Sequence, residues 1–189
     1  MRNEIHRQFI HYIGGNAGLA ILALSAIYKL DKTIPLSIFI ALFLIGLFIS
    51  QKLQKGHSLP LFSALIKHVE RPAETQTPGK PALLFLLGAI LTTALFEIWP
   101  AIIGLIVLTY GDSVSTLIGK YRGRLELVSD RTLEGTLAGI LAAIAVLQFI
   151  IPQDKAIGIG VIGMLAEYLP VDDNLGIPLV GALAATLLL

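Results

Sequence analysis

The sequence contains no cysteine, four histidines, one tryptophan and only 14% charged residues. The absence of cysteine excludes a disulfide framework, a thiolate nucleophile and a cysteine-ligated metal. Four histidines are too few for a histidine-rich metal site, and the motifs G-x-S-x-G and H-E-x-x-H are absent. Since the net charge is +1, the chain has no overall electrostatic bias toward DNA or RNA, and we expect no nucleic-acid partner.

Most of the sequence is apolar. Hydrophobic residues make up 55% of the 189 residues, and the mean hydropathy is +0.80. With glycine included, the apolar share is roughly 65%, against about 45–50% in a soluble domain. A soluble protein of this size cannot bury so much apolar surface. We therefore expect residues 1–189 to form a single polytopic membrane domain.

Seven apolar segments approach the length of about 20 residues that a bilayer crossing requires. Proline stands at three of their entrances, where a missing N–H group does no harm to a helix. The sequence therefore predicts an all-α fold, a membrane helix bundle of about seven transmembrane helices. The last two segments are short, so either could be re-entrant or tilted instead. The predicted spans are 11–28, 33–50, 81–98, 100–119, 135–151, 156–169 and 175–189.

The positive charges predict the orientation of these spans. Eleven of the 14 lysine and arginine residues lie on the side of the N-terminus, and three lie on the other side. The positive-inside rule then places the N-terminus in the cytosol, in the plasma membrane if the protein is prokaryotic. The larger cytosolic connections are 51–80 and 120–134. Residues 57–72 alternate apolar and basic side chains, which predicts an amphipathic helix at the headgroup level.

Polar residues at membrane depth are concentrated in segment 109–120. Thr109, Asp112, Ser115, Thr116 and Gly119 have the spacing of one helix face, and Asp112 falls in the cytosolic half of the predicted span. Serine and threonine at such positions often serve as hydrogen-bonding contacts between helices. An ionised aspartate at this depth requires a cation, which favours a functional role for Asp112.

Two further clusters lie at predicted cytosolic boundaries. Four basic residues between 120 and 131 are either the ordinary positive-inside flank or part of an anion site, since the next helix begins directly after them. Asp172, Asp173 and Asn174 follow Glu167 and are either oxygen ligands for Mg²⁺ or the N-cap of the last span. Carboxylates for a divalent metal beside basic side chains are the groups that phosphoryl transfer from a nucleotide requires.

The same residues resemble a known family, the CTP-dependent lipid-alcohol kinases, which include dolichol kinase, phytol kinase and the CTP-dependent diacylglycerol kinase. The resemblance runs in order through GDSVSTLIGKYRGR, DRTLEGTLAG and AEYLPVDDNLGIPLVGAL, and it includes the N-terminal EIHRQFIH. Two positions depart from the family pattern. Arg131-Thr132 stands where the family often has Lys-Ser, and Gln8 stands where a second basic residue is common.

The resemblance implies transfer of the terminal phosphate of CTP to the hydroxyl group of a dolichol- or polyprenol-type lipid alcohol, at the cytosolic membrane face and with a divalent metal such as Mg²⁺. We expect catalytic roles for Asp112 and Asp173, and either one carboxylate or His11 would accept the proton from the lipid alcohol. The metal would be held by Asp112 with Asp172 or Asp173. Nucleotide binding is implied for Lys120, Gly123, Arg124, Arg131, Glu134, Gly135, Thr136 and Asn174.

Two alternatives stay open at this stage. A CTP:lipid-phosphate cytidylyltransferase would use CTP in a similar membrane region but would release pyrophosphate. A small ion-coupled transporter would use Asp112 and Glu167 as an ion or proton relay. The expected partners are CTP, the lipid alcohol and the surrounding membrane lipids, and the sequence does not identify the alcohol.

Overall fold

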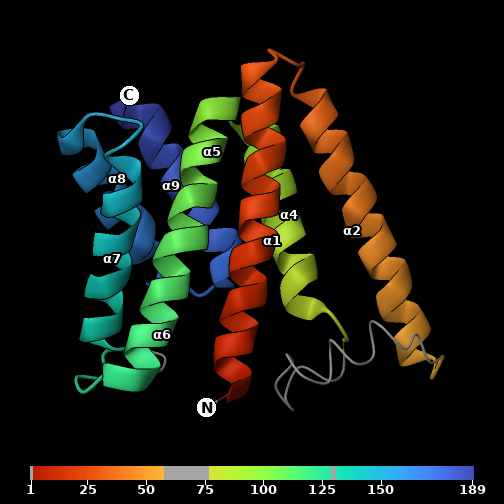
Figure 1. Ribbon diagram of the computed structural model, residues 1–189, viewed down its shortest axis with the longest axis horizontal. Coiled ribbons are helices and arrows are strands. Elements are labelled where there is room, and N and C mark those ends of the chain that lie inside the picture. The colour runs from red at the N-terminus through yellow and green to blue at the C-terminus, as the bar shows by residue number, and fades with distance from the viewer. Residues whose placement is uncertain (1, 58–76, 129–130) are drawn as a thin grey trace.

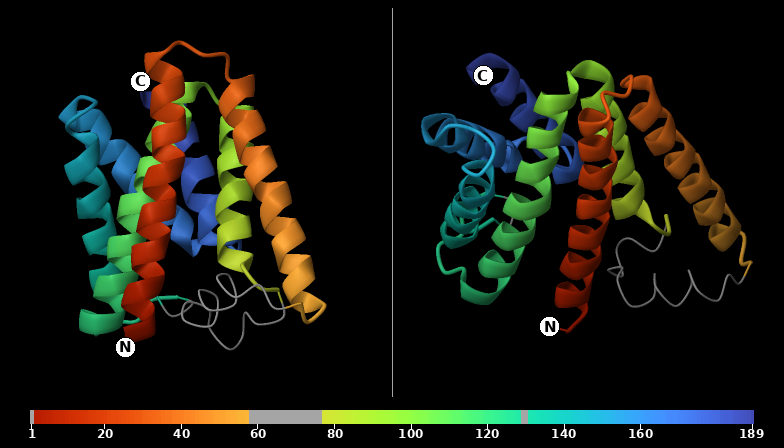
Figure 2. Two further views of the ribbon diagram at one scale, coloured as in Figure 1. Left: turned by 45° about the vertical axis from the view of Figure 1, so that its right-hand side comes forward. Right: turned by 45° about the horizontal axis from the view of Figure 1, so that its top comes forward.

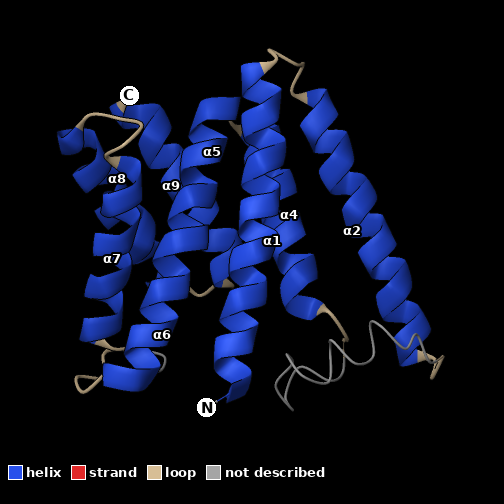
Figure 3. Cartoon of the chain, in the orientation of Figure 1, coloured by secondary structure: helices blue, strands red, loops and turns tan. Residues whose placement is uncertain are grey.

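The computed structural model describes residues 2–57, 77–128 and 131–189. Within these ranges the chain is helical and contains no β-strand, as predicted (Figure 3). The predicted amphipathic helix falls almost entirely on residues 58–76, outside the described residues. The helices are α1 (Arg2–Ile27), α2 (Thr33–Gln54), α4 (Lys80–Leu95), α5 (Ile98–Ile106), η2 (Val107–Asp112), α6 (Ser113–Arg122), α7 (Leu133–Leu147), α8 (Gln153–Leu165), η3 (Ala166–Tyr168) and α9 (Asp173–Leu188).

Each of the seven predicted spans overlaps one of the helices, with α5, η2 and α6 forming one continuous helix. Three of these helices are long and apolar enough to cross a membrane, namely Ile5–Ile27, Thr33–Gln54 and Ile98–Arg122. They indicate a membrane protein. Helices α4, α7 and α9 are apolar but shorter, and α8 has 13 residues. The count of seven crossings and the cytosolic N-terminus stay predictions.

Helix α5 forms the centre of the bundle. Its side chains from Ala101 to Ile106 are buried, and α1, α4, α7 and α9 surround it (Figures 1 and 2). Helix α2 lies at the edge and exposes large apolar side chains, for example Leu44 at 58% and Phe48 at 61%. Because apolar side chains on the outside of a bundle are stable against lipid tails, this exposure agrees with a membrane location.

Glycines hold α9 close to α4 and α5. A methyl group on Gly104 of α5 would overlap the carbonyl oxygen of Pro178, and one on Gly88 of α4 would overlap the carbonyl oxygen of Asn174. Pro178 lies inside α9 and has no N–H group to offer the carbonyl of Asn174, four residues earlier. That carbonyl lies instead against Gly88, so the start of α9 packs midway along α4.

The turn between α8 and α9 therefore lies part-way along the bundle and not at its end (Figures 1 and 2). The continuous helix Ile98–Arg122 has 25 residues, or about 38 Å at 1.5 Å per residue, whereas the 13 residues of α8 reach only about 20 Å. This geometry agrees with the re-entrant alternative for the last two apolar segments. It places residues 167–174 part-way along the bundle, with Glu167 buried and residues 169–172 exposed.

We predict that Gly104→Ala destabilises the protein by about 1–3 kcal/mol, because the new methyl group forces α5 and α9 apart at a backbone contact. Gly14→Ala in α1 is the matched control, since nothing lies within 4 Å of a methyl group there. Thermal unfolding in detergent measures both variants. Equal unfolding temperatures for the two variants would contradict the close packing of α5 on α9.

Candidate functional site

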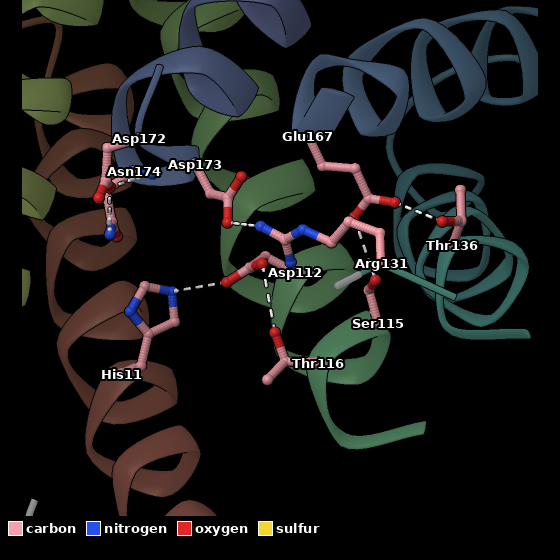
Figure 4. Close-up of polar contacts among 10 residues, drawn as sticks. All are labelled: His11, Asp112, Ser115, Thr116, Arg131, Thr136, Glu167, Asp172, Asp173 and Asn174. Atoms are coloured by element: carbon pink, nitrogen blue, oxygen red, sulfur yellow. Dashed lines mark hydrogen bonds and ion pairs between the residues drawn. The ribbon is translucent and has the colours of Figure 1, made fainter. Parts of the chain in front are cut away.

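Three charged side chains from separate parts of the chain meet inside the bundle. Asp112 ends η2, Arg131 precedes α7, and Asp173 begins α9. The guanidinium of Arg131 donates a hydrogen bond to the carboxylate of Asp173, and Asp112, only 8% exposed, lies within electrostatic range of the same guanidinium (Figure 4). The structure thus brings together acidic and basic groups that are 61 positions apart at the extremes.

A π-helical turn positions Asp112. Because such a turn contains more residues than an α-turn, it rotates the side chains that follow it, and π-turns are frequent at functional sites. The polar residues expected on one helix face, from Thr109 to Gly119, consequently face two neighbouring helices. Asp112 faces His11 of α1, while Ser115 and Gly119 face α7.

His11 and Asp112 face each other across a short gap. The distance from His11 Nε2 to Asp112 Oδ2 is 3.9 Å, which is too long for a hydrogen bond, and His11 Nε2 has no hydrogen-bond partner among the described residues. The imidazole ring packs edge-on against Phe85 of α4, with 5.9 Å between ring centroids. The other oxygen of Asp112, Oδ1, lies 3.5 Å from the hydroxyl of Thr116. The gap leaves both His11 and Asp112 with hydrogen-bonding capacity for a ligand.

Arg131 is surrounded by more negative charge than it can balance. Burial disfavours its charged form, but the carboxylates of Asp173, Asp112 and Glu167 more than offset burial and raise the pKa of Arg131 above its usual value. The guanidinium therefore stays cationic at every relevant pH. Arg7 of α1 also lies within electrostatic range of Asp112, so the carboxylates of the site are near two cationic side chains.

The residues Asp172, Asp173 and Asn174 have three different environments. Asp172 is the N-cap of α9, and its Oδ1 accepts hydrogen bonds from the backbone N–H of Asn174 at 3.0 Å and from the side-chain amide of Asn174 at 2.9 Å. Asp173 points toward Arg131 instead (Figure 4). The amide oxygen of Asn174 is buried and has no hydrogen-bond partner in the described parts of the chain. The N-cap alternative from the sequence thus describes Asp172, while Asp173 belongs to the charged site.

The segment around Glu134 ties α6 to α7. Thr132 caps α7 by accepting a hydrogen bond from the N–H of Gly135 at 3.2 Å. The carboxylate of Glu134 accepts hydrogen bonds from the backbone N–H groups of Arg124 at 3.1 Å and Leu125 at 3.3 Å. These bonds fix the connection between α6 and α7 to the first turn of α7. A methyl group on Gly135 would meet the carbonyl oxygen of Ser115 at 2.8 Å, so glycine permits the close approach of α6.

The residues predicted for the nucleotide loop lie further along α6. Lys120 is exposed near the end of α6, and Gly123 and Arg124 follow that helix. Arg122 lies about 15 Å along the helix axis from Asp112. A groove of about 490 Å³ opens there, and it is lined by Tyr121, Arg122, Gly123, Arg124 and Glu134. Two arginines make this groove suitable for an anionic ligand.

Sequence reasoning named Glu167 for the transporter alternative but not among the residues of the kinase site. Its carboxylate is only 4% exposed and accepts hydrogen bonds from the hydroxyl of Ser115 at 3.1 Å and from the hydroxyl of Thr136 (Figure 4). The Thr136 hydroxyl also lies 2.6 Å from the hydroxyl of Tyr168. The predicted nucleotide residue Thr136 therefore makes internal contacts. A glutamate within a predicted span was the signal that pointed to this network.

No three histidine, cysteine, aspartate or glutamate side chains in residues 2–57, 77–128 and 131–189 are grouped closely enough to hold a metal ion by themselves. Mg²⁺ is commonly bound by one or two carboxylates together with the phosphates of a substrate. Asp112 and Asp173 are the two carboxylates that share Arg131, and they have the oxygen donors such an ion prefers.

The fold and the site define a helical membrane protein with a charged centre inside its bundle. The chain is 32% identical over 147 residues to a protein of the archaeon Methanocaldococcus jannaschii that is described as uncharacterized protein MJ1137, and the match covers 76% of this chain and 71% of the archaeal protein. The chain belongs to the same family as this archaeal protein. No protein-family profile matches the chain, and no solved structure matches it significantly.

A second similar protein is named as an enzyme. The chain is 38% identical over 101 residues to the dolichol kinase of Saccharomyces cerevisiae. The match covers 51% of this chain but only 19% of the yeast protein, so the chain corresponds to about a fifth of that enzyme.

We predict that Arg131→Met destabilises the fold by about 1.5–3 kcal/mol, because it removes a charged hydrogen bond and the cation that Asp112, Asp173 and Glu167 share. The matched control is Lys155→Met, which removes the exposed ion pair with Asp154 and should cost less than about 1 kcal/mol. Thermal unfolding in detergent compares the two variants. The loss of unfolding free energy caused by Arg131→Met should be smaller when Asp173→Asn is already present. Strictly additive losses in the double variant would contradict the pairing of Arg131 with Asp173.

Proposed function

We propose that this protein transfers the terminal phosphate of CTP to the hydroxyl group of a membrane isoprenoid or other lipid alcohol, of the dolichol or polyprenol type, at the cytosolic membrane face. The observation that carries the proposal is the meeting of Asp112, Arg131 and Asp173 inside a chain that is similar to yeast dolichol kinase. This partial similarity supports a lipid kinase. The use of CTP rests on the resemblance of the motifs around Asp112 and Asp173 to the CTP-dependent lipid-alcohol kinases.

The reaction requires a proton acceptor beside the lipid hydroxyl. The hydroxyl oxygen attacks the terminal phosphorus, a new oxygen–phosphorus bond forms, the bond to the bridging oxygen of the β-phosphate breaks, and CDP leaves. His11 Nε2 and Asp112 Oδ2 lie 3.9 Å apart, a separation that one hydroxyl oxygen at hydrogen-bonding distance from each would match. We assign the hydroxyl proton to His11 Nε2 or to the Asp112 carboxylate, since both face this gap.

The phosphates require positive charge. The planar guanidinium of Arg131 suits two phosphate oxygens, and its carboxylate neighbours keep it charged. Lys120 and Arg124 lie toward the loop end of α6, from which a water-soluble nucleotide would arrive. In this proposal Arg131 binds the transferring phosphoryl group, and the loop side chains bind the remainder of the nucleotide.

A divalent metal fits the donor set. Asp112 with Asp172 or Asp173 would hold it, because these side chains supply oxygen ligands and the site has excess negative charge. When bound, such an ion neutralises charge on the phosphates. The finding that no three ligating side chains are grouped in the described ranges favours an ion that arrives together with the nucleotide.

The test uses purified full-length protein in lipid nanodiscs with Mg²⁺, a panel of lipid alcohols and CTP labelled at either the α- or the γ-phosphate. We expect γ-label in a lipid product that mass spectrometry identifies as a phosphorylated alcohol. Appearance of the α-label in lipid would instead show cytidylyl transfer and contradict the kinase. The absence of labelled lipid with every alcohol in the panel would also contradict it.

We predict that Asp112→Asn lowers the rate of phosphate transfer by about 100-fold or more, because it removes charge from the reacting centre. Asp154→Asn is the matched control, since Asp154 is an exposed carboxylate in the first turn of α8. Its transfer rate should stay within about twofold of wild type, as expected for an exposed surface substitution. A rate near wild type for Asp112→Asn would remove Asp112 from the site.

A further inference from the structure

Glu167 is a buried carboxylate that the proposed phosphate transfer does not use. It lies in η3, the single 3-10 turn between α8 and α9, and it has no ion-pair partner within hydrogen-bonding distance among the described residues. A buried carboxylate is costly unless other groups donate hydrogen bonds to it. Its hydrogen-bonding partners therefore indicate what it contributes.

Those partners come from two other helices. One carboxylate oxygen of Glu167 accepts from the hydroxyl of Ser115 in α6 at 3.1 Å, and the other accepts from the hydroxyl of Thr136 in α7. The phenol of Tyr168, 2.6 Å from the Thr136 hydroxyl, adds a further contact to the same group. One side chain thus connects α6, α7 and the α8–α9 turn inside the bundle (Figure 4).

Each connected segment also carries one residue of the charged site. Ser115 is three residues after Asp112, and Glu167 is six residues before Asp173. Thr136 is one turn after Thr132, whose carbonyl oxygen lies 3.1 Å from the Thr136 hydroxyl, and Arg131 directly precedes Thr132. Displacement of any of these three segments would change the position of Arg131 relative to the two aspartates.

We infer that Glu167 is a positioning residue for phosphoryl transfer: through Ser115 and Thr136 it fixes the segments that carry Asp112, Arg131 and Asp173 in reacting geometry. The inference rests on the proposed function for its catalytic part. Glu167 itself does not touch the phosphate or the lipid hydroxyl in this account. Its contribution is the rigid placement of side chains that do.

Four variants of the full chain separate positioning from general packing. Glu167→Gln removes the charge while keeping the shape, and Thr136→Val removes one hydrogen-bonding hydroxyl at nearly constant volume. Thr136→Ser restores that hydroxyl. Thr93→Val is the matched control, because Thr93 is fully buried in α4 and its hydroxyl has no hydrogen-bond partner in the described residues.

Hydrogen–deuterium exchange measures the placement without any substrate. We expect faster exchange of the backbone amides in 112–116 and 131–136 in Glu167→Gln and Thr136→Val, and wild-type exchange there in Thr136→Ser and Thr93→Val. Wild-type exchange in both Glu167→Gln and Thr136→Val would overturn the inference. This readout decides the positioning claim even if the wild-type protein transfers no phosphate, which would refute the proposed function separately.

If the wild-type protein transfers phosphate, steady-state kinetics test the effect of Glu167 on the rate of that transfer. We expect kcat to fall by about 10- to 100-fold in Glu167→Gln and Thr136→Val, since a misplacement of about 1 Å can cost that much, and most of the loss should fall in kcat and not in KM. Thr136→Ser should recover to within about threefold of wild type. A loss that Thr136→Ser does not recover, or that Thr93→Val shares, would identify a packing effect and overturn the inference.

Discussion

The structure depends on one guanidinium placed among three carboxylates in an apolar bundle. If Arg131 were absent, the carboxylates of Asp112, Asp173 and Glu167 would repel one another in surroundings that solvate charge poorly. The guanidinium of Arg131 attracts these carboxylates, which favours the packing of the segment before α7 against the end of η2 and the start of α9. The remaining excess of negative charge is what makes the place suitable for a cation and for phosphates. The same attraction therefore accounts for local stability and for the proposed chemistry.

Packing of apolar and small residues sets the depth of this centre. Helices α8 and α9 are too short to run the length of the bundle, and Gly88 and Gly104 let the start of α9 approach α4 and α5 closely. The charged residues consequently lie about 15 Å along α6 from the arginine groove at its end. A site between a polar loop and a lipid-facing bundle is where a water-soluble nucleotide and a membrane alcohol could meet.

The apolar pattern predicted the all-α fold and the place of every described helix, because apolar runs bounded by proline and charge are strong local signals. It also indicated Asp112 and the residues 172–174. It did not reveal the π-turn at 107–112, which lies among α1, α7, α8 and α9 from distant parts of the chain. The sequence also predicted Glu134 and Thr136 as nucleotide-binding residues, whereas both make internal contacts in the structure. Hydrogen-bond partners from other helices decide such roles.

The most direct measurement is an experimental structure of the full chain in nanodiscs with Mg²⁺ and a CTP analogue that cannot transfer its terminal phosphate. We predict that the terminal phosphate lies between Asp112 and Arg131 and that the nucleotide extends toward the loop after α6. A nucleotide bound elsewhere on the protein, or Asp112 and Asp173 found apart from Arg131, would contradict it.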